Sequence, residues 1–181
     1  NEYYRYDWKP RFSVIHQLRS VEKQTTDLEK SEIRRKHGID ENAFVLCSFG
    51  YVARSKLNDR VVEGFNNLIR HSDRKCTLWF IGGISDHDYK NKILSKINSL
   101  GLMHKVQFTG FVDQEEYEDY FRMADVAVQL RDKSRGETSR AILDSMAHGL
   151  PVIINDHGTN RDFDEGVLKI SDPVDVEELS R

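Results

Sequence analysis

Residues 136–154, with the sequence GETSRAILDSMAHGLPVII, form the stretch that decides the fold of this chain. A small polar loop with hydroxyl residues leads into an amphipathic run that stops at Gly149, and Pro151 is followed by purely apolar residues. Hydroxyl caps at the start and a glycine at the end are typical of a helix, which the pattern predicts over 138–148. The apolar run predicts a buried strand over 152–154.

Two acidic residues lie on the polar side of this unit, Glu137 in the loop and Asp144 in the expected helix. Backbone N–H groups at the positive end of a helix favour phosphate, and carboxylates can accept hydrogen bonds from the hydroxyls of a ribose or hexose. The unit is therefore a candidate site for an anion and a sugar. An ordinary capped helix is the competing interpretation, because Glu and Thr are also favourable in a first turn.

Outside this unit the chain alternates between strand-like and helix-like runs. The strand-like runs are rich in Val, Ile and Phe without period-two polarity, which is typical of strands buried on both faces. The alternation indicates an α/β fold, a Rossmann-like doubly wound parallel sheet with helices on both faces. The expected strands are 44–49, 77–81, 106–108, 126–130, 152–154 and 167–170, and the expected helices are 59–71, 88–99, 114–123 and 138–148.

The first 40 residues differ from the rest. Residues 1–17 are aromatic and irregular, and a charged helix that ends at His37 is expected after them. We therefore expect an interdomain linker and leading helix over 1–40, and one α/β domain over 41–181.

Both ends of the chain suggest a piece of a longer protein. The chain starts at Asn1 instead of Met, and residues 172–181 resemble the start of a helix that is cut off after about two turns. We expect a preceding domain and a final C-terminal helix to be absent.

The composition disfavours several partners. A formal net charge of −3 with interspersed signs provides no basic field for nucleic acid or an anionic membrane. No apolar run approaches the ~20 residues that span a bilayer, and no signal peptide is recognisable. Cys47 falls in an expected strand and Cys76 directly before one, which is typical of buried free thiols in a cytosolic protein. A cytoplasmic location is expected, with peripheral membrane association of the full-length protein left open.

Ligands of doubly wound sheets bind beyond the carboxyl ends of the strands, so the loops there are candidate binding loops. The first begins at Gly50 and contains Arg54 and Lys56 before a helix. Cations are unfavourable at a helix N-terminus, so a bound anion such as a diphosphate would explain them. Solvated loop cations are the competing interpretation.

The second loop, GGISDHD at 82–88, starts with two glycines that allow a ligand to approach closely. It also contains an Asp-x-Asp triplet, as does DFD at 162–164. Such triplets bind a metal in other proteins, but N-cap and first-turn roles explain Asp86 and Asp88 more simply. No metal site is predicted.

The segment 136–154 resembles the signature region of the group 1 glycosyltransferases, retaining nucleotide-sugar enzymes of the GT-B architecture. Their pattern is a Glu, seven residues, a second Glu, and then Ala-Met-Ala-x-Gly-x-Pro-Val-Val. Asp144 takes the second acidic position here and the following residues match closely, whereas Glu137 stands one residue later than the first Glu. The resemblance implies that Glu137 contacts the donor sugar and Asp144 the ribose.

Two further loops resemble family motifs. The first is similar to Gly-Arg-x-x-x-x-Lys-Gly, whose Arg and Lys hold the donor diphosphate. Gly50 and Lys56 match, but the family Arg falls at Tyr51, so Arg54 is the expected substitute. The loop at Gly82 resembles a Gly-x-Gly turn near the nucleotide.

The loop after the third strand resembles the family's Gly-Phe-Val-x-x-x-Glu-Leu segment, in which main chain beside the glycine meets the base. The resemblance implies nucleotide contacts at Gly110, Phe111 and Val112. Asp113 is in addition a good N-cap for the next helix.

Together these motifs imply the C-terminal, nucleotide-sugar-binding half of a retaining glycosyltransferase. It would move a hexose-type sugar from a nucleotide diphosphate sugar, without metal or other cofactor, to the hydroxyl of a glycan or lipid-linked acceptor in polysaccharide biosynthesis. Glu137 and Lys56 are the implied catalytic residues, and the N–H groups of Thr138 and Ser139 would help Lys56 to neutralise the diphosphate. The chain alone is expected to be inactive, because the N-terminal acceptor domain is missing.

Two alternatives stay open. A non-catalytic nucleotide-sugar-binding or assembly subunit would show changes such as Tyr51 for Arg and a displaced Glu137. A dinucleotide enzyme shares the fold class, but no Gly-x-Gly-x-x-Gly follows the first strand. The sequence leaves the base, the sugar, the acceptor and the oligomeric state undetermined.

Overall fold

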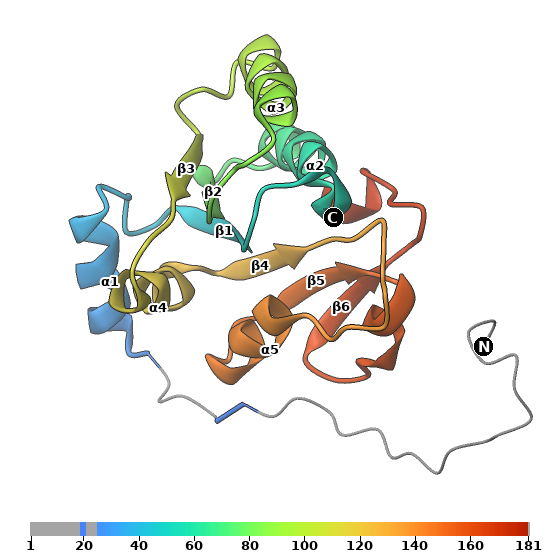
Figure 1. Ribbon diagram of the computed structural model, residues 1–181. Helices are drawn as coiled ribbons and strands as arrows, with labels where there is room; N and C mark the ends of the chain where they lie inside the picture. The colour runs from blue at the N-terminus through green and yellow to red at the C-terminus, as the bar shows by residue number, and fades with distance from the viewer. Residues whose placement is uncertain (1–18, 21–24, 181) are drawn as a thin grey trace, which may run out of the picture.

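The computed structural model describes residues 19–20 and 25–180; the linker expected over 1–17 lies outside the described residues. The described chain folds around a six-stranded parallel sheet with the order β3-β2-β1-β4-β5-β6 (Figure 1). The sheet confirms the predicted doubly wound class, and each expected strand is present within two residues of its expected bounds. The strands are β1 (Phe44–Phe49), β2 (Cys76–Ile81), β3 (Val106–Gly110), β4 (Val126–Gln129), β5 (Val152–Asn155) and β6 (Val167–Ile170).

Helices α1, α3 and α4 begin at side chains that cap them. Thr26 forms a capping box with Glu29, and Asp86 and Asp113 each accept a hydrogen bond from a backbone N–H of the first turn, so both predicted Asp caps are confirmed. The helices are α1 (Asp27–Lys36), α2 (Asn58–His71), α3 (His87–Ser99), α4 (Gln114–Met123) and α5 (Arg140–Ala147), with 3₁₀ turns η1 (Arg54–Lys56), η2 (Gly158–Asp162) and η3 (Glu178–Ser180).

The helix expected over 138–148 is shorter than predicted. It starts at Arg140, with Ser139 as its N-cap, so Glu137 and Thr138 belong to the preceding loop. The loop is held from both sides: the Glu137 carbonyl accepts a hydrogen bond from the Thr159 hydroxyl, and its carboxylate accepts one from the Arg135 backbone N–H. These contacts keep Glu137 out of the helix and fix its position.

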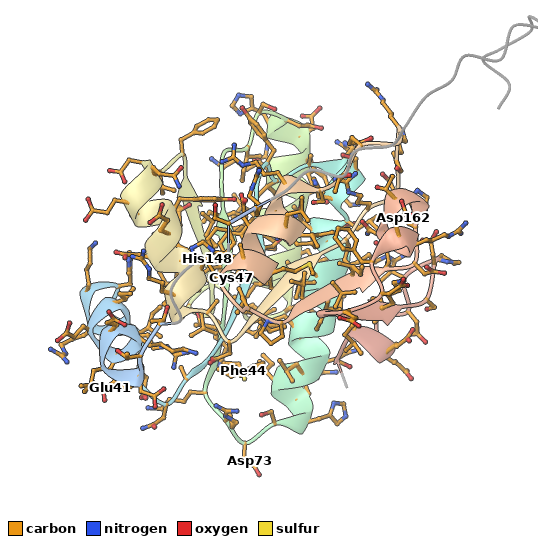
Figure 2. The ribbon with its side chains drawn as sticks, turned by 90° about the horizontal axis from the view of Figure 1, so that it is seen from below. Glu41, Phe44, Cys47, Asp73, His148 and Asp162 are labelled. Atoms are coloured by element: carbon orange, nitrogen blue, oxygen red, sulfur yellow. The ribbon has the colours of Figure 1, made fainter. Side chains whose placement is uncertain are left out.

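Helices cover both faces of the sheet, as predicted (Figure 1). On one face α2 and α3 pack with Leu46 of β1, and on the other α4 and α5 pack with Val45 and Cys47. Cys47 and Cys76 are buried free thiols, which confirms the expectation from sequence. Figure 2 shows Cys47 in the interior and Asp73 at the periphery.

Helix α1 is attached to the sheet by an ion pair between the buried Arg34 and the partly buried Asp125. The guanidinium of Arg34 donates to the carbonyl oxygens of Met123 and Ala43 and to the Asp125 carboxylate, the last at 2.8 Å. Asp125 also accepts hydrogen bonds from Lys30 and from the Val45 backbone N–H. Burial opposes ionisation of Asp125, but these partners hold its pKa below the ordinary value. The leading helix therefore packs onto the α/β domain.

The direction in which strands are added reverses beside β1. The chain proceeds from β1 to β2 and β3 on one side and then returns to place β4 on the other side of β1. Ligands of open α/β sheets bind at such a switch point, beyond the carboxyl ends of the strands. The loops that follow β1 and β4 are therefore the main candidates for a site.

None of the helices within residues 19–20 and 25–180 has the length and apolarity needed to span a bilayer.

Candidate functional site

The loops after β1 and β2 are joined through their backbones. The N–H of Gly50 donates to the carbonyl of Ile81 at 2.8 Å, and that of Val52 donates to Gly83 at 3.0 Å. Gly82 has a φ of 138°, and a Cβ there would lie 2.3 Å from the Gly50 carbonyl oxygen. Only glycine fits this close crossing, so the glycines of both loops define one rigid surface at the carboxyl edge.

Two exposed aromatic rings lie on this surface. The side chains of Tyr51 and Phe111 are 55% and 77% exposed, and their ring centroids are 5.5 Å apart in an edge-to-face arrangement. Phe111 lies close over Gly83, where a Cβ would be 2.5 Å from its ring. Gly110, with a φ of 72°, provides the turn, and Val112 packs against the core behind it. The exposed rings can contact the flat face of a base.

Lys56 lies at the end of η1, after β1. Its side chain is partly buried, and its ammonium has no hydrogen bond or ion pair with any residue in the described ranges. Burial, and next the positive charge of Arg131, lower the pKa of Lys56, while the Glu137 carboxylate raises it. Lys56 is therefore a cation that is partly desolvated and available for an anion.

The other predicted cation of this loop, Arg54, has partners elsewhere. Its Nε lies 3.0 Å from the Asp86 carboxylate, and its guanidinium lies 5.1 Å from the ring centroid of Tyr89. Asp86 is the N-cap of α3, so Arg54 is directed toward that helix. Because the ion pair is exposed, it contributes little stability and can exchange.

The Glu137 carboxylate is 53% exposed but fixed in orientation. One oxygen accepts a hydrogen bond from Nη1 of Arg131 at 2.8 Å, and the other accepts one from the Arg135 backbone N–H at 2.7 Å. Its own backbone N–H and that of Arg135 hold the pKa of Glu137 below the ordinary value, and Arg131 adds to the effect. Glu137 therefore presents an ionised acceptor at neutral pH.

Arg131 is a functional candidate that sequence reasoning missed. It lies just after β4, and its backbone N–H and carbonyl are both bound by the buried Asn155 side chain, at 2.9 and 2.7 Å. The next residue, Asp132, donates its N–H to the Ser55 carbonyl at 3.1 Å, which ties this loop to η1. The signal available in the sequence was its position directly after an expected strand.

Asp144 lies apart from these residues, on α5 at the side that faces α4. One oxygen accepts a hydrogen bond from Arg19 at 2.5 Å and the other from Arg140 at 3.1 Å. The carboxylate lines a depression of about 180 Å³ together with Tyr117 and His148. Burial and the nearby Asp144 charge raise the pKa of Tyr117 to about 12. Asp144 is thus a partly covered acceptor beside a small polar pocket.

The structure therefore brings together Lys56, Glu137 and Arg131 at the switch point, and leaves Arg54 and Asp144 outside that cluster. Thr138 and the buried Ser139 connect Glu137 to α5, and the Ser139 side chain makes no capping hydrogen bond. In the described part of the chain, no group of three or more His, Cys, Asp or Glu side chains could hold a metal ion.

The chain is similar in sequence to known sugar-transferring proteins. The model of a family described as glycosyl transferases group 1 matches residues 29–177. The chain is 29% identical over 161 residues to mannosylfructose-phosphate synthase of Agrobacterium fabrum. That match covers 85% of this chain and 34% of the synthase, so the chain spans about a third of its relative.

Solved structures share the fold. Anabaena HepE in complex with UDP and glucose has a TM-score of 0.74 at 20% identity, over 87% of this chain and 42% of HepE. The C-terminal domain of the Francisella tularensis group 1 protein LpcC has a TM-score of 0.71 at 21% identity, over 83% of this chain and 78% of that domain. Because the family model also matches most of its length, this chain belongs to the group 1 glycosyltransferases.

Proposed function

We propose that this chain is the donor-binding domain of a retaining glycosyltransferase that transfers a hexose-type sugar from a nucleotide diphosphate sugar to an acceptor hydroxyl. The observation that carries the proposal is the position of Lys56 and Glu137 at the switch point beside β1 and β4. A partly desolvated ammonium favours an anion, and a fixed carboxylate favours sugar hydroxyls. The HepE structures contain UDP with glucose, or UDP-glucose, which supports such a donor for this chain.

The proposed roles follow from the positions of the residues. Lys56 and the N–H groups of Thr138 and Ser139 would neutralise the diphosphate as it leaves, an effect worth several kcal/mol in a closed site. Glu137 would accept hydrogen bonds from the sugar. Asp144 would contact the ribose through lone pairs that its two arginine partners leave free.

The base would lie against the glycine-rich loops. Phe111 offers an exposed ring, and the backbone around Gly110 and Val112 offers hydrogen-bonding groups. Gly50 and Gly82 would line the same edge closer to the diphosphate. The roles are carried by protein groups alone, so the proposed transfer uses no metal.

The domain division and setting are part of the same proposal. Residues 41–181 would form the donor domain and 1–40 the linker and leading helix, with the acceptor, a glycan or lipid-linked sugar of polysaccharide biosynthesis, held by a second domain. The buried free thiols Cys47 and Cys76 support a reducing compartment such as the cytoplasm.

A thermal-shift panel of nucleoside diphosphates and their sugars tests the donor role. A matching nucleotide at 100 times its dissociation constant should stabilise the chain by about 2.7 kcal/mol, whereas other bases should stabilise it less. A panel in which no nucleotide raises the melting temperature at millimolar concentration would exclude the proposal.

Binding without transfer is a second candidate function. The observation in its favour is that arginines already engage the carboxylates of both Glu137 and Asp144. A transfer assay in which this chain is joined to an acceptor-binding domain of a group 1 glycosyltransferase distinguishes the two, because a binding subunit would retain the nucleotide sugar unchanged.

A further inference from the structure

We propose that Arg131 is the second diphosphate-binding cation of this site, in the role for which the sequence suggested Arg54. This inference rests on the proposed donor-binding function and names a residue of that same site. It would place one cation after β1, at Lys56, and one after β4, on the two sides of the switch point.

The first argument is the burial of an incompletely bonded guanidinium. The Arg131 side chain is only 8% exposed, and among the described residues it donates only through Nη1, to Glu137. Its Nε is buried without a hydrogen-bond partner within the described part of the chain. Leaving a buried charged donor unpaired is costly, so the arrangement favours a ligand with several acceptor oxygens.

The second argument is the charge of the cluster. Lys56 and Arg131 are close enough that the Arg131 charge lowers the pKa of Lys56, and the Glu137 carboxylate opposes this effect. The three side chains together carry an excess of one positive charge. Two cations placed together at a partly buried position repel each other unless an anion joins them. A diphosphate has the required charge and enough oxygens to contact both cations.

The third argument is rigidity. The Asn155 side chain holds both backbone groups of Arg131, and its amide also donates to Asp172 at 3.1 Å. Asp132 fixes the neighbouring backbone to η1. Arg131 therefore projects from a frame that joins the carboxyl ends of β4 and β5. In contrast, Arg54 is an exposed side chain engaged with Asp86.

A chemical consequence follows from the shared guanidinium. The planar fork of arginine can bond a carboxylate with one edge and a phosphate with another, which lysine cannot do. Arg131 would thus position Glu137 against the sugar while it holds the diphosphate, so that the sugar and leaving-group contacts are set by one group.

The test uses the full 181-residue chain. Wild-type protein is titrated with UDP, GDP and ADP by calorimetry and with the corresponding nucleosides by ligand-detected NMR. The nucleoside diphosphate that binds is then titrated into Arg131→Met, Arg131→Lys, Arg54→Met and, as a control for lost charge on α2, Arg70→Met. Circular dichroism and melting curves report whether each variant is folded.

Arg131→Met should weaken diphosphate binding roughly tenfold to a hundredfold and leave nucleoside binding unchanged, because the charge-assisted contact exists only with phosphate. Arg131→Lys should lose less, since it keeps the charge without the fork. Arg54→Met should lose less than Arg131→Met, and Arg70→Met should bind like wild type. If Arg131→Met does not fold, the diphosphate affinity of Arg131→Lys tests the assignment.

Unchanged diphosphate affinity in folded Arg131→Met and Arg131→Lys would overturn the assignment, as would an equal loss of nucleoside affinity. Either result leaves the proposed function standing, because the wild type still binds the diphosphate. A wild type that binds none of the three diphosphates overturns this assignment together with the donor-binding proposal.

Discussion

At the scale of single residues, the environment of Lys56 makes its charge sensitive to pH. Its ordinary pKa of 10.5 is lowered, first by burial and then by Arg131. An unbound chain therefore loses this positive charge at a lower pH than an exposed lysine would. A bound diphosphate stabilises the charged form, so binding and proton uptake at Lys56 are coupled.

We therefore expect nucleoside diphosphate affinity to fall as pH rises through the lowered pKa of Lys56. Phosphate ionisation does not compete with this change, because it is nearly complete above about pH 8. Lys56→Arg keeps its charge throughout and should bind with little dependence on pH between 8 and roughly 10. Calorimetric titrations across this range provide the measurement. Parallel pH profiles for wild type and Lys56→Arg would rule out Lys56 as the titrating group.

Glu137→Gln tests the sugar contact. Gln has the size of Glu but only one acceptor oxygen and no charge, so it should reduce the preference for the nucleotide sugar over the bare nucleotide by roughly tenfold. Glu165→Gln, at an exposed loop position before β6, is the matched control. The quantity to compare between the variants is the ratio of the dissociation constant of the bare nucleotide to that of the nucleotide sugar. An unchanged ratio in Glu137→Gln would remove this carboxylate from the sugar site.

The candidate residues differ in how far the sequence could predict them. Lys56 and Glu137 were identifiable because each lies in a patterned segment near a glycine turn or a helix start. Arg131 had only the weaker signal of its position directly after an expected strand, because its proposed role depends on β4 lying beside β1, a pairing of distant segments. Arg54 was favoured by local spacing, but the position of Asp86 and Tyr89, more than thirty residues later, directs it elsewhere.

At the scale of elements, patterns within a segment predicted the strands and caps well. The error at the start of α5 has a physical cause: Thr159 and Arg135 hold Glu137 in a loop that the local sequence would allow to be helical. Helix propensity is a weak preference that tertiary hydrogen bonds override. The attachment of α1 was likewise not predictable, since Asp125, the partly buried partner of Arg34, lies about ninety residues along the chain.

The attachment of α1 can be tested by Arg34→Met. The substitution removes a buried guanidinium and leaves Asp125 and the carbonyls of Ala43 and Met123 with fewer donors. Removing one partner of a buried pair costs about 3–5 kcal/mol, so the urea midpoint should fall sharply. Arg35→Met, one residue later on the exposed side of α1, should stay within about 0.5 kcal/mol of wild type. Similar decreases in the free energy of unfolding for both variants would show that the ion pair between Arg34 and Asp125 stabilises the chain no more than an exposed arginine does.

At the scale of the whole molecule, the two apolar clusters explain why the site is at one edge. Helices α2 and α3 cover one face and α4 and α5 the other, so the ends of the strands are the main approach to β1 and β4 at the middle of the sheet. The glycine loops, Lys56, Arg131 and Glu137 all follow carboxyl ends of strands. The strand alternation predicted this edge, whereas the observed order of the strands was needed to show that β1 and β4 are neighbours.

The extent of the chain leads to the last prediction. The chain spans 34% of the synthase and 42% of HepE, so most of each relative has no counterpart in it. We expect the purified 181 residues to bind a nucleotide sugar but to transfer none, because transfer needs an acceptor held in place and water kept out, roles that we propose for a second domain. A radiolabelled donor, a panel of sugar acceptors and a full-length group 1 glycosyltransferase as positive control provide the assay. Transfer by the 181 residues at a rate near that of the control enzyme would show that these residues contain a complete active site.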